Sequence, residues 1–266
     1  MIIAGLTKSA QWLFSGWLTD AMAAPTPVSA LLHAATMVTA GNFLVLRVCT
    51  LWTYSLCLNY LIPSAGAFTA LSAGITGSIQ SDKKKIIAYS TTGQLGNMLF
   101  SCGLSNYSGA MFHLFSHGFF KALLFLAAGG AIHSLGYEQD IYKIGGINKS
   151  LPLGYIFILI GSLSLIGIPF YTGNYSKDLI IHASDYSYVW SDLFLNWISN
   201  IPILLTTLYS TKLLYLVFIK EARANKSTIL KVGEGSKLTL FPLIIALGIP
   251  SIGLGYLGTM ICSSSF

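Results

Sequence analysis

This sequence is unusually poor in charge. Only 9% of its 266 residues are charged while 54% are hydrophobic, and the mean hydropathy is +0.68. Soluble domains carry about 25% charged residues, so a water-soluble fold is excluded. Apolar runs recur along the whole length, which leaves no segment for a separate soluble domain. We therefore predict an all-α polytopic membrane protein in which residues 1–266 form a single transmembrane domain.

Cysteine is scarce as well. The four cysteines, Cys49, Cys57, Cys102 and Cys262, show no CxxC or other metal-ligand spacing, so neither a disulfide framework nor a zinc site is indicated. The net charge of +6 reflects basic connections between membrane helices rather than nucleic-acid binding, for which the sequence has no signature. We expect no metal site and no nucleic-acid partner.

Long apolar segments fill most of the chain. They lie at about 1–18, 27–50, 58–81, 86–104, 109–135, 152–188, 193–219 and 238–262, and crossing a bilayer takes roughly 20 residues. Segment 152–188 is long enough for two crossings but is interrupted by "IGIPFYTGNYSKD", with Pro169, Gly173 and Lys177. Two crossings would place the basic connection 220–237 opposite the other charged connections, so we predict one broken crossing and about eight crossings in total.

Ionisable residues inside these apolar segments are costly. A lysine at mid-membrane costs roughly 2.5 to 3.5 kcal/mol on insertion scales, so each needs a partner, water or a function. Steps of four residues place three of the groups on one helix face about 6 Å apart, where they can pass protons. A broken helix with a lysine at the break also favours a transport path. The candidate proton-relay residues are Lys8, His33, His113, His117, Lys121 and Lys177, with Asp178 beside the last.

Other interpretations of these residues are less favoured. They could be satisfied polar groups that bridge helices, and Lys212, near a segment end, could reach the membrane interface. The HxxxH spacing of His113 and His117 could bind a metal or haem. No third ligand follows at suitable spacing, however, and Lys121 would repel a cation.

Carboxylates are almost absent from the apolar segments. Only Asp178 lies at a plausible membrane depth, next to Lys177. Lys8 and His33 therefore have no evident acidic partner in the chain. Either water or another polypeptide must therefore supply the hydrogen-bonding or charged partner of Lys8 and His33.

Four long motifs connect the sequence to a known family. They are "LTKSAQWLFSGWLTDAMAAPTPVSALLHAATMVTAGNFLVLR", "SDKKKIIAYSTTGQLGNM", "MFHLFSHGFFKALLFLAAGGAIH" and "GGINKSLPL". In this order they resemble the proton-conducting antiporter-like subunits of respiratory complex I, NADH:ubiquinone oxidoreductase, and most closely its distal subunit, chain 5. Relatives of that subunit include the large subunits of multisubunit sodium/proton antiporters. The resemblance runs from residue 1 to about 220 and loosely to 262.

The resemblance implies a fold and roles for single residues. The fold is built from inverted five-helix repeats, each with a broken helix. Lys8 resembles the lysine of the first broken helix and His33 the linking histidine, whereas Lys177, followed by Asp178, matches the lysine of the second. His113, His117 and Lys121 resemble the central relay, and Asp82 and Lys84 match a structural or gating loop pair.

The departure from the family is large. Family members carry about six further helices before the position of Met1, including the glutamate that pairs with the lysine resembling Lys8. We therefore expect a split subunit whose N-terminal helices and glutamate lie on another chain, the alternative being a truncated reading frame. FMN, iron–sulfur clusters and ubiquinone are expected on other subunits, and no cofactor on this chain.

The expected function is that of a proton-translocating membrane-arm subunit of complex I without a redox centre of its own. Its partners would be other membrane-arm subunits and membrane lipids, in the mitochondrial inner membrane or alternatively a bacterial plasma membrane. A subunit of a sodium/proton antiporter, driven by ion gradients, is one alternative. A non-pumping structural scaffold is another, but a scaffold would not need several intramembrane lysines.

Overall fold

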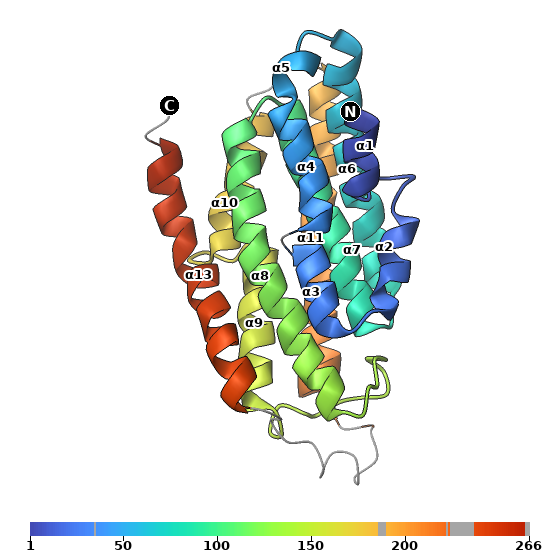
Figure 1. Ribbon diagram of the computed structural model, residues 1–266, viewed down its shortest axis with the longest axis vertical. Helices are drawn as coiled ribbons and strands as arrows, with labels where there is room; N and C mark the ends of the chain where they lie inside the picture. Colours follow the sequence, from blue (N-terminus) through green and yellow to red (C-terminus); the bar gives the residue numbers. More distant parts are fainter. Residues whose placement is uncertain (35, 186–189, 222, 224–236, 264–266) are drawn as a thin grey trace.

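The described part of the chain is a bundle of helices (Figure 1). The computed structural model describes residues 1–34, 36–185, 190–221, 223 and 237–263. The helices are α1 (Ile2–Lys8), α2 (Gly16–Asp20), the 3₁₀ turn η1 (Ala21–Ala23), α3 (Thr26–Ala34), α4 (Met37–Arg47), α5 (Cys49–Trp52), α6 (Leu56–Ile79), α7 (Lys83–Gly103), α8 (Tyr107–Ser134), α9 (Pro152–Ile166), α10 (Thr172–Asp185), α11 (Trp190–Leu214), the π-helical turn η2 (Tyr215–Ile219) and α13 (Lys237–Ser263).

The eight expected apolar segments each correspond to one helix or to one pair of helices. Within the described residues, four spans are long and apolar enough to cross a membrane: Thr26–Arg47, Leu56–Ile79, Tyr107–Ser134 and Phe194–Ile219. The all-α polytopic fold is confirmed. Segment 1–18, expected as one run, is instead divided, because residues 9–15 between α1 and α2 are not helical.

Segment 152–188 is broken, as predicted, into α9 and α10. Gly167 ends α9 with φ +89, a left-handed conformation that glycine adopts at little cost. Pro169 lies in the break before α10 begins at Thr172. A Cβ on Gly173 would lie 1.6 Å from the carbonyl oxygen of Ser164, so only glycine lets the two half-helices pack this closely. The predicted breaking residues therefore act at the break.

The charged connections lie at one end of the bundle. Asp82 and Asp140 form an isolated antiparallel bridge that joins two of these connections. A Cβ on Gly145 would lie 2.4 Å from the carbonyl oxygen of Glu221, so the third connection begins at the same place. Most of connection 220–237 lies outside the described residues. The part that is described agrees with one shared, basic side.

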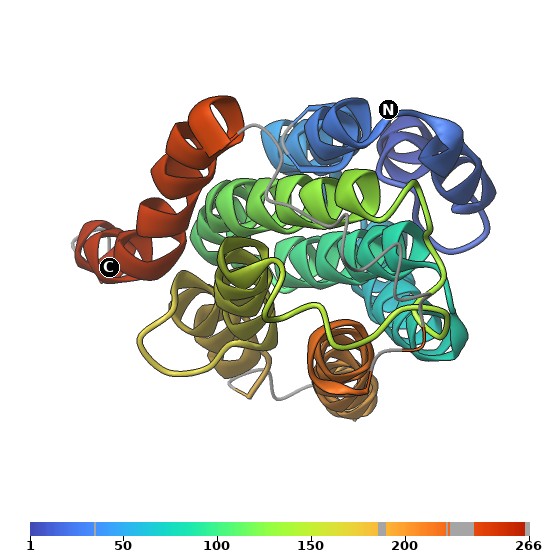
Figure 2. The same cartoon turned by 90° about the horizontal axis from the view of Figure 1, so that it is seen from below.

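Helix α8 lies in the middle of the bundle. In the view from below, α3 and α4 (blue) lie on one side of α8 (green) and α7 (teal) lies on the opposite side (Figure 2). Helices α9 (olive) and α13 (red) also contact α8, toward the left of this view. Phe120, Leu123 and Phe125 on α8 belong to the main hydrophobic core. The polar residues in the middle of α8, from His113 to Lys121, are therefore surrounded by protein.

Candidate functional site

Helix α8 carries three buried ionisable groups on one face. His113, His117 and Lys121 each have 0% of their side chain exposed. The ring centroids of His113 and His117 are 6.4 Å apart, close to the spacing that steps of four residues predict. The sequence pattern thus becomes a row of ionisable groups inside the bundle.

His113 connects three helices. Its Nδ1 atom lies 2.8 Å from Oγ of Ser176 on α10, and its Nε2 atom lies 3.0 Å from Oε1 of Gln94 on α7. An amide oxygen only accepts, so Nε2 carries a proton and donates to Gln94. In neutral His113, Nδ1 then accepts from the Ser176 hydroxyl.

The Ser176 hydroxyl can act as donor or acceptor toward His113, depending on the charge of the histidine. Its hydroxyl lies 3.2 Å from the carbonyl oxygen of Thr172 in the preceding turn. When His113 is protonated, Nδ1 donates to Ser176 and the hydroxyl proton turns to Thr172. The bridge from α8 to α10 therefore persists in both protonation states.

Lys121 is held by helix α7. Its Nζ atom donates to Oγ of Ser90 at 2.6 Å and to the carbonyl oxygen of Ile87 at 3.4 Å. It has no carboxylate within ion-pair distance among the described residues. In the described residues its Nζ atom is therefore hydrogen-bonded by neutral oxygens alone.

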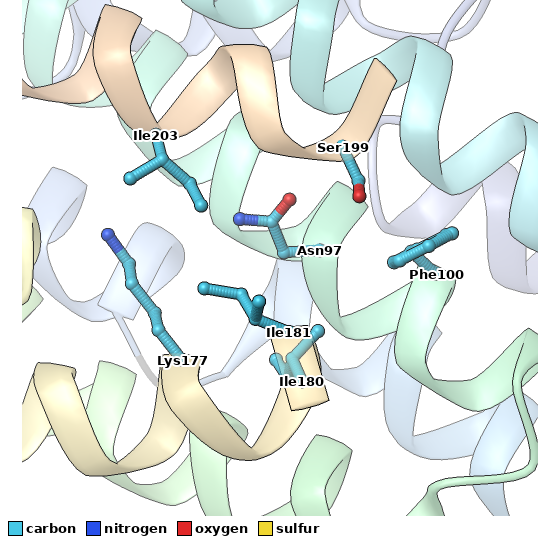
Figure 3. Close-up of a pocket in the computed structure, with 7 residues that line it drawn as sticks. All are labelled: Asn97, Phe100, Lys177, Ile180, Ile181, Ser199 and Ile203. Carbon is cyan, nitrogen blue, oxygen red and sulfur yellow. The ribbon is translucent and has the colours of Figure 1, made fainter. Parts of the chain in front are cut away.

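Lys177 lies at the break between α9 and α10. Its Nζ atom donates to the carbonyl oxygen of Leu165 and, at 3.3 Å, to that of Ile166. These carbonyls belong to the last turn of α9, where intrahelical donors are missing and a positive charge is stabilised. Figure 3 shows Lys177 on α10 and Asn97 on α7 lining a small cavity, together with side chains from α11. The neighbouring Asp178 forms no ion pair with Lys177 within the described residues.

His33 and His117 have orphaned ring nitrogens. Both rings are buried, and none of their four nitrogens has a hydrogen-bond partner within the described chain. The ring centroids of His33 and Phe125 on α8 are 5.4 Å apart, so α3 brings His33 against α8. Buried polar atoms of this kind are satisfied by ordered water. Water is therefore the expected link between His33 and the row on α8.

Lys8 lies at the first break. It is the last residue of α1, its side chain is exposed, and it forms no ion pair in the part of the chain that the structure describes. The indole of Trp17 donates to the carbonyl of Thr7 at 3.1 Å, which satisfies one backbone group freed by the break. Ala10 and Leu13 have positive φ angles of 50° and 76° within it. The first break is thus built like the second, but its lysine faces outward.

Asp82 and Lys84, which the resemblance matches to a structural or gating loop pair, bond to different groups. Asp82 instead pairs with Lys85 at 3.4 Å, one helical turn along. Lys84 turns inward, and its Nζ atom donates to the carbonyl oxygen of Ala24 at 3.0 Å. Spacing in the sequence could not distinguish these lysines, because burial against residues 23–27 selects which one turns inward.

Lys212 is hydrogen-bonded to the end of a neighbouring helix. Its Nζ atom donates to the carbonyl oxygens of Ser78 and Gln80 at 2.8 and 3.1 Å. The ammonium also lies 5.5 Å from the ring centroid of Tyr142. Lys212 therefore caps the carboxyl end of α6 from α11.

Several polar residues of the site were missed from sequence. Ser90, Gln94 and Asn97 on α7 are spaced four and three residues apart, so they share one helix face. This row of polar residues in an apolar segment could have predicted a polar face of α7 toward the site. Ser176 could have been found because it directly precedes Lys177 in the sequence. In the described ranges, no group of three His, Cys, Asp or Glu side chains could hold a metal ion.

Known proteins resemble this chain along its whole length. The family described as "NADH:quinone oxidoreductase/Mrp antiporter, TM" matches residues 1–209. NADH-ubiquinone oxidoreductase chain 5 of Dictyostelium citrinum is 48% identical over 100% of this chain and 41% of that protein. The wheat (Triticum aestivum) protein of the same name is 48% identical over 97% and 38%. The chain thus spans about two fifths of the length of these relatives.

Solved structures show the same fold. The Mrp complex from Dietzia sp. DQ12-45-1b contains a chain that is 31% identical, with a TM-score of 0.77, over 95% of this chain and 29% of its own length. A chain of the membrane-bound sulfane sulfur reductase, an archaeal respiratory complex, has a TM-score of 0.78 at 24% identity, over 98% and 54%. The second likeness concerns the fold alone.

Proposed function

The chain belongs to the family of NADH:quinone oxidoreductase and Mrp antiporter membrane subunits, and from this premise we propose that it translocates protons as part of a complex I membrane subunit. We place it in the mitochondrial inner membrane, because relatives named as subunits of NADH-ubiquinone oxidoreductase come from eukaryotes such as Dictyostelium and wheat. FMN, iron–sulfur clusters and ubiquinone would reside on other subunits.

The hydrogen bond between His113 and Ser176 carries this proposal. It joins the buried row on α8, which ends at Lys121, to the helix that holds Lys177. Helices α8 and α10 thus carry the groups that would bind and release protons, and α7 supplies hydrogen-bond partners to two of them. An inert scaffold would not need to solvate two buried lysines in this way.

The proposed mechanism uses proton affinity and charge. His33, His117 and His113 pass protons laterally, through water where their ring nitrogens lack partners. Two like charges at an effective dielectric of 20 repel by about 4 kcal/mol at 4 Å and less at longer range, so a proton on Lys121 disfavours one on Lys177. Redox energy from other subunits would enter as a change in the charges near Lys8.

The partner of Lys8 is proposed to lie outside this chain. An exposed lysine amid membrane helices needs a carboxylate, and its own chain supplies none in the described residues. An apolar groove of about 450 Å³, lined by Ile3, Leu6, Trp52 and Leu61 among others, lies along α1 and α6. A chain with the N-terminal helices and a glutamate would fill this groove, and lipids would cover the other exposed apolar residues.

The test is proton pumping by membrane vesicles that contain the assembled complex. Lys177→Met should abolish most pumping per NADH oxidised, whereas the control Lys149→Met, at an exposed residue of a connection, should leave it unchanged. Equal pumping in both variants would overturn the proposal. Pumping that requires sodium without NADH oxidation would instead favour the antiporter.

A second experiment tests the partner. Mass spectrometry of the affinity-purified native complex should find NADH dehydrogenase subunits and a further chain with an intramembrane glutamate. Lys8→Gln should then reduce pumping without releasing that chain, because the apolar groove holds it. Recovery of this chain without either component would contradict the proposed assembly.

A further inference from the structure

Thr172, the first residue of α10, is hydrogen-bonded to two other helices. Its hydroxyl oxygen lies 2.7 Å from the backbone carbonyl oxygen of Ser251 on α13 and 3.1 Å from Oγ of Ser164 on α9. A carbonyl oxygen only accepts, so Thr172 donates to Ser251 and accepts from Ser164. One hydroxyl group therefore fixes the start of α10 to both α9 and α13.

This contact between α10 and α13 is buried and close. Ser164, Thr172 and Ser251 are 0%, 1% and 0% exposed, so water does not replace a hydrogen bond that is lost there. A Cβ on Gly255 of α13 would lie 2.8 Å from the Cα atom of Thr172. Since real Cβ atoms do not come this near, the lack of a side chain at Gly255 lets the two helices approach.

The first turn of α10 also supplies the acceptors that Ser176 needs. Oγ of Ser176 lies 3.2 Å from the carbonyl oxygen of Thr172 and 3.3 Å from that of Gly173. Its other partner is Nδ1 of His113, at 2.8 Å. A protonated His113 donates to Ser176, so the Ser176 proton must then turn to one of these carbonyls. The position of the first turn therefore matters most when His113 is charged.

We propose that Thr172 is a positioning residue for proton transfer at His113, which holds the first turn of α10 where Ser176 can exchange its donor and acceptor roles. This inference rests on the proposed function. It adds α13 to the helices that shape the site. The Thr172 hydroxyl is engaged with Ser164 and Ser251, so it is assigned no proton-carrying step.

An anchor of this kind is needed because α10 begins at a break. Residues 167–171 are not helical, so no helical hydrogen bonds run from α9 into the first turn of α10. Packing of Gly173 limits how closely α10 approaches α9, whereas the Thr172 hydroxyl fixes α10 against α13. Hydrogen bonds are lost beyond about 3.5 Å. The Ser176 contacts of 3.2 and 3.3 Å would thus be lost after a shift of a few tenths of an ångström.

The experiment measures the rate of proton pumping at matched NADH oxidation, per assembled complex, in membrane vesicles. Thr172→Val keeps the side-chain shape without the hydroxyl and should slow pumping roughly two- to five-fold, the effect of losing one hydrogen bond. Thr172→Ser keeps the hydroxyl and should restore most of the rate. Thr206→Val is the matched control, because Thr206 is buried but its hydroxyl bonds to Ile203 of its own helix; this variant should pump normally.

A Ser176→Ala background distinguishes positioning from a general effect on packing. If Thr172 acts through Ser176, Thr172→Val should add no further loss to that of Ser176→Ala. An additional loss in this background would overturn the inference. Normal pumping by Thr172→Val, or equal slowing by Thr172→Val and Thr172→Ser, would overturn it as well.

Failure of this inference is distinguishable from failure of the proposed function. Lys177→Met is the reference variant. If it pumps normally, the proposed function fails and the inference with it. If Lys177→Met does not pump while Ser176→Ala or Thr172→Val pumps normally, the inference alone fails.

Discussion

Nδ1 of His113 on α8 lies 2.8 Å from Oγ of Ser176 on α10. The two residues are 63 positions apart in the sequence, and their contact joins the ionisable row on α8 to the helix that carries Lys177. The hydroxyl can donate to a neutral imidazole and accept from a charged one. A single small side chain therefore couples the central helix to the second broken helix.

Ser176→Ala should interrupt this coupling. Loss of one hydrogen bond, worth about 1 kcal/mol, should slow proton pumping roughly five-fold if transfer between α8 and α10 limits the rate. Ser176→Thr keeps the hydroxyl and should retain most of the rate. Pumping measured at matched NADH oxidation tests both, and equal rates in the alanine and threonine variants would contradict a role for the hydroxyl.

Lys121→Met should abolish proton pumping without lowering the stability of the complex. Methionine matches the length of the lysine side chain, and replacing a buried unpaired charge by an apolar group is often neutral or stabilising. Pumping should be lost while the thermal stability of the assembled complex stays equal or rises. A strongly destabilised complex would show instead that Lys121 is a structural residue.

Gly173→Ala should disrupt the second broken helix. The added Cβ would lie 1.6 Å from the carbonyl oxygen of Ser164, so α10 must move away from α9, at a cost of about 3 kcal/mol or more. Gly130→Ala, on α8 with nothing within 4 Å of its Cβ, is the control and should be neutral or slightly stabilising. The measurement is the yield and thermal stability of the complex, and equal yields would refute the packing argument.

Lys212→Met should weaken the charged end of the bundle. The substitution removes two hydrogen bonds to the carboxyl end of α6 and should lower the free energy of unfolding by about 1–3 kcal/mol. Lys212→Arg keeps donors and charge and should be milder. Resistance of the complex to denaturing detergent checks this, and an unaffected Lys212→Met variant would return Lys212 to the role of an interfacial lysine.

Much of this molecule follows from local rules in the sequence. The low charge and the apolar runs determine a helical membrane protein, because a bilayer accepts only backbone that satisfies its own hydrogen bonds. Steps of four residues place His113, His117 and Lys121 on one face, since the pitch of a helix is fixed. Pro169 and Gly173 predict the break near Lys177 from the sequence, because their effects on the backbone act within a few residues.

Contacts between helices were decided only by the tertiary structure. Sequence spacing does not say how helices rotate and pack against one another, so it could not join His113 to Ser176 or Lys212 to α6. It likewise could not tell that Lys84 turns inward while Lys85 pairs with Asp82. These contacts and side-chain orientations depend on which side chains fill the space between segments that are distant in the sequence. The sequence by itself determined where ionisable groups lie along the helices, because helical pitch is fixed, and the packing of the helices decided which of these groups meet.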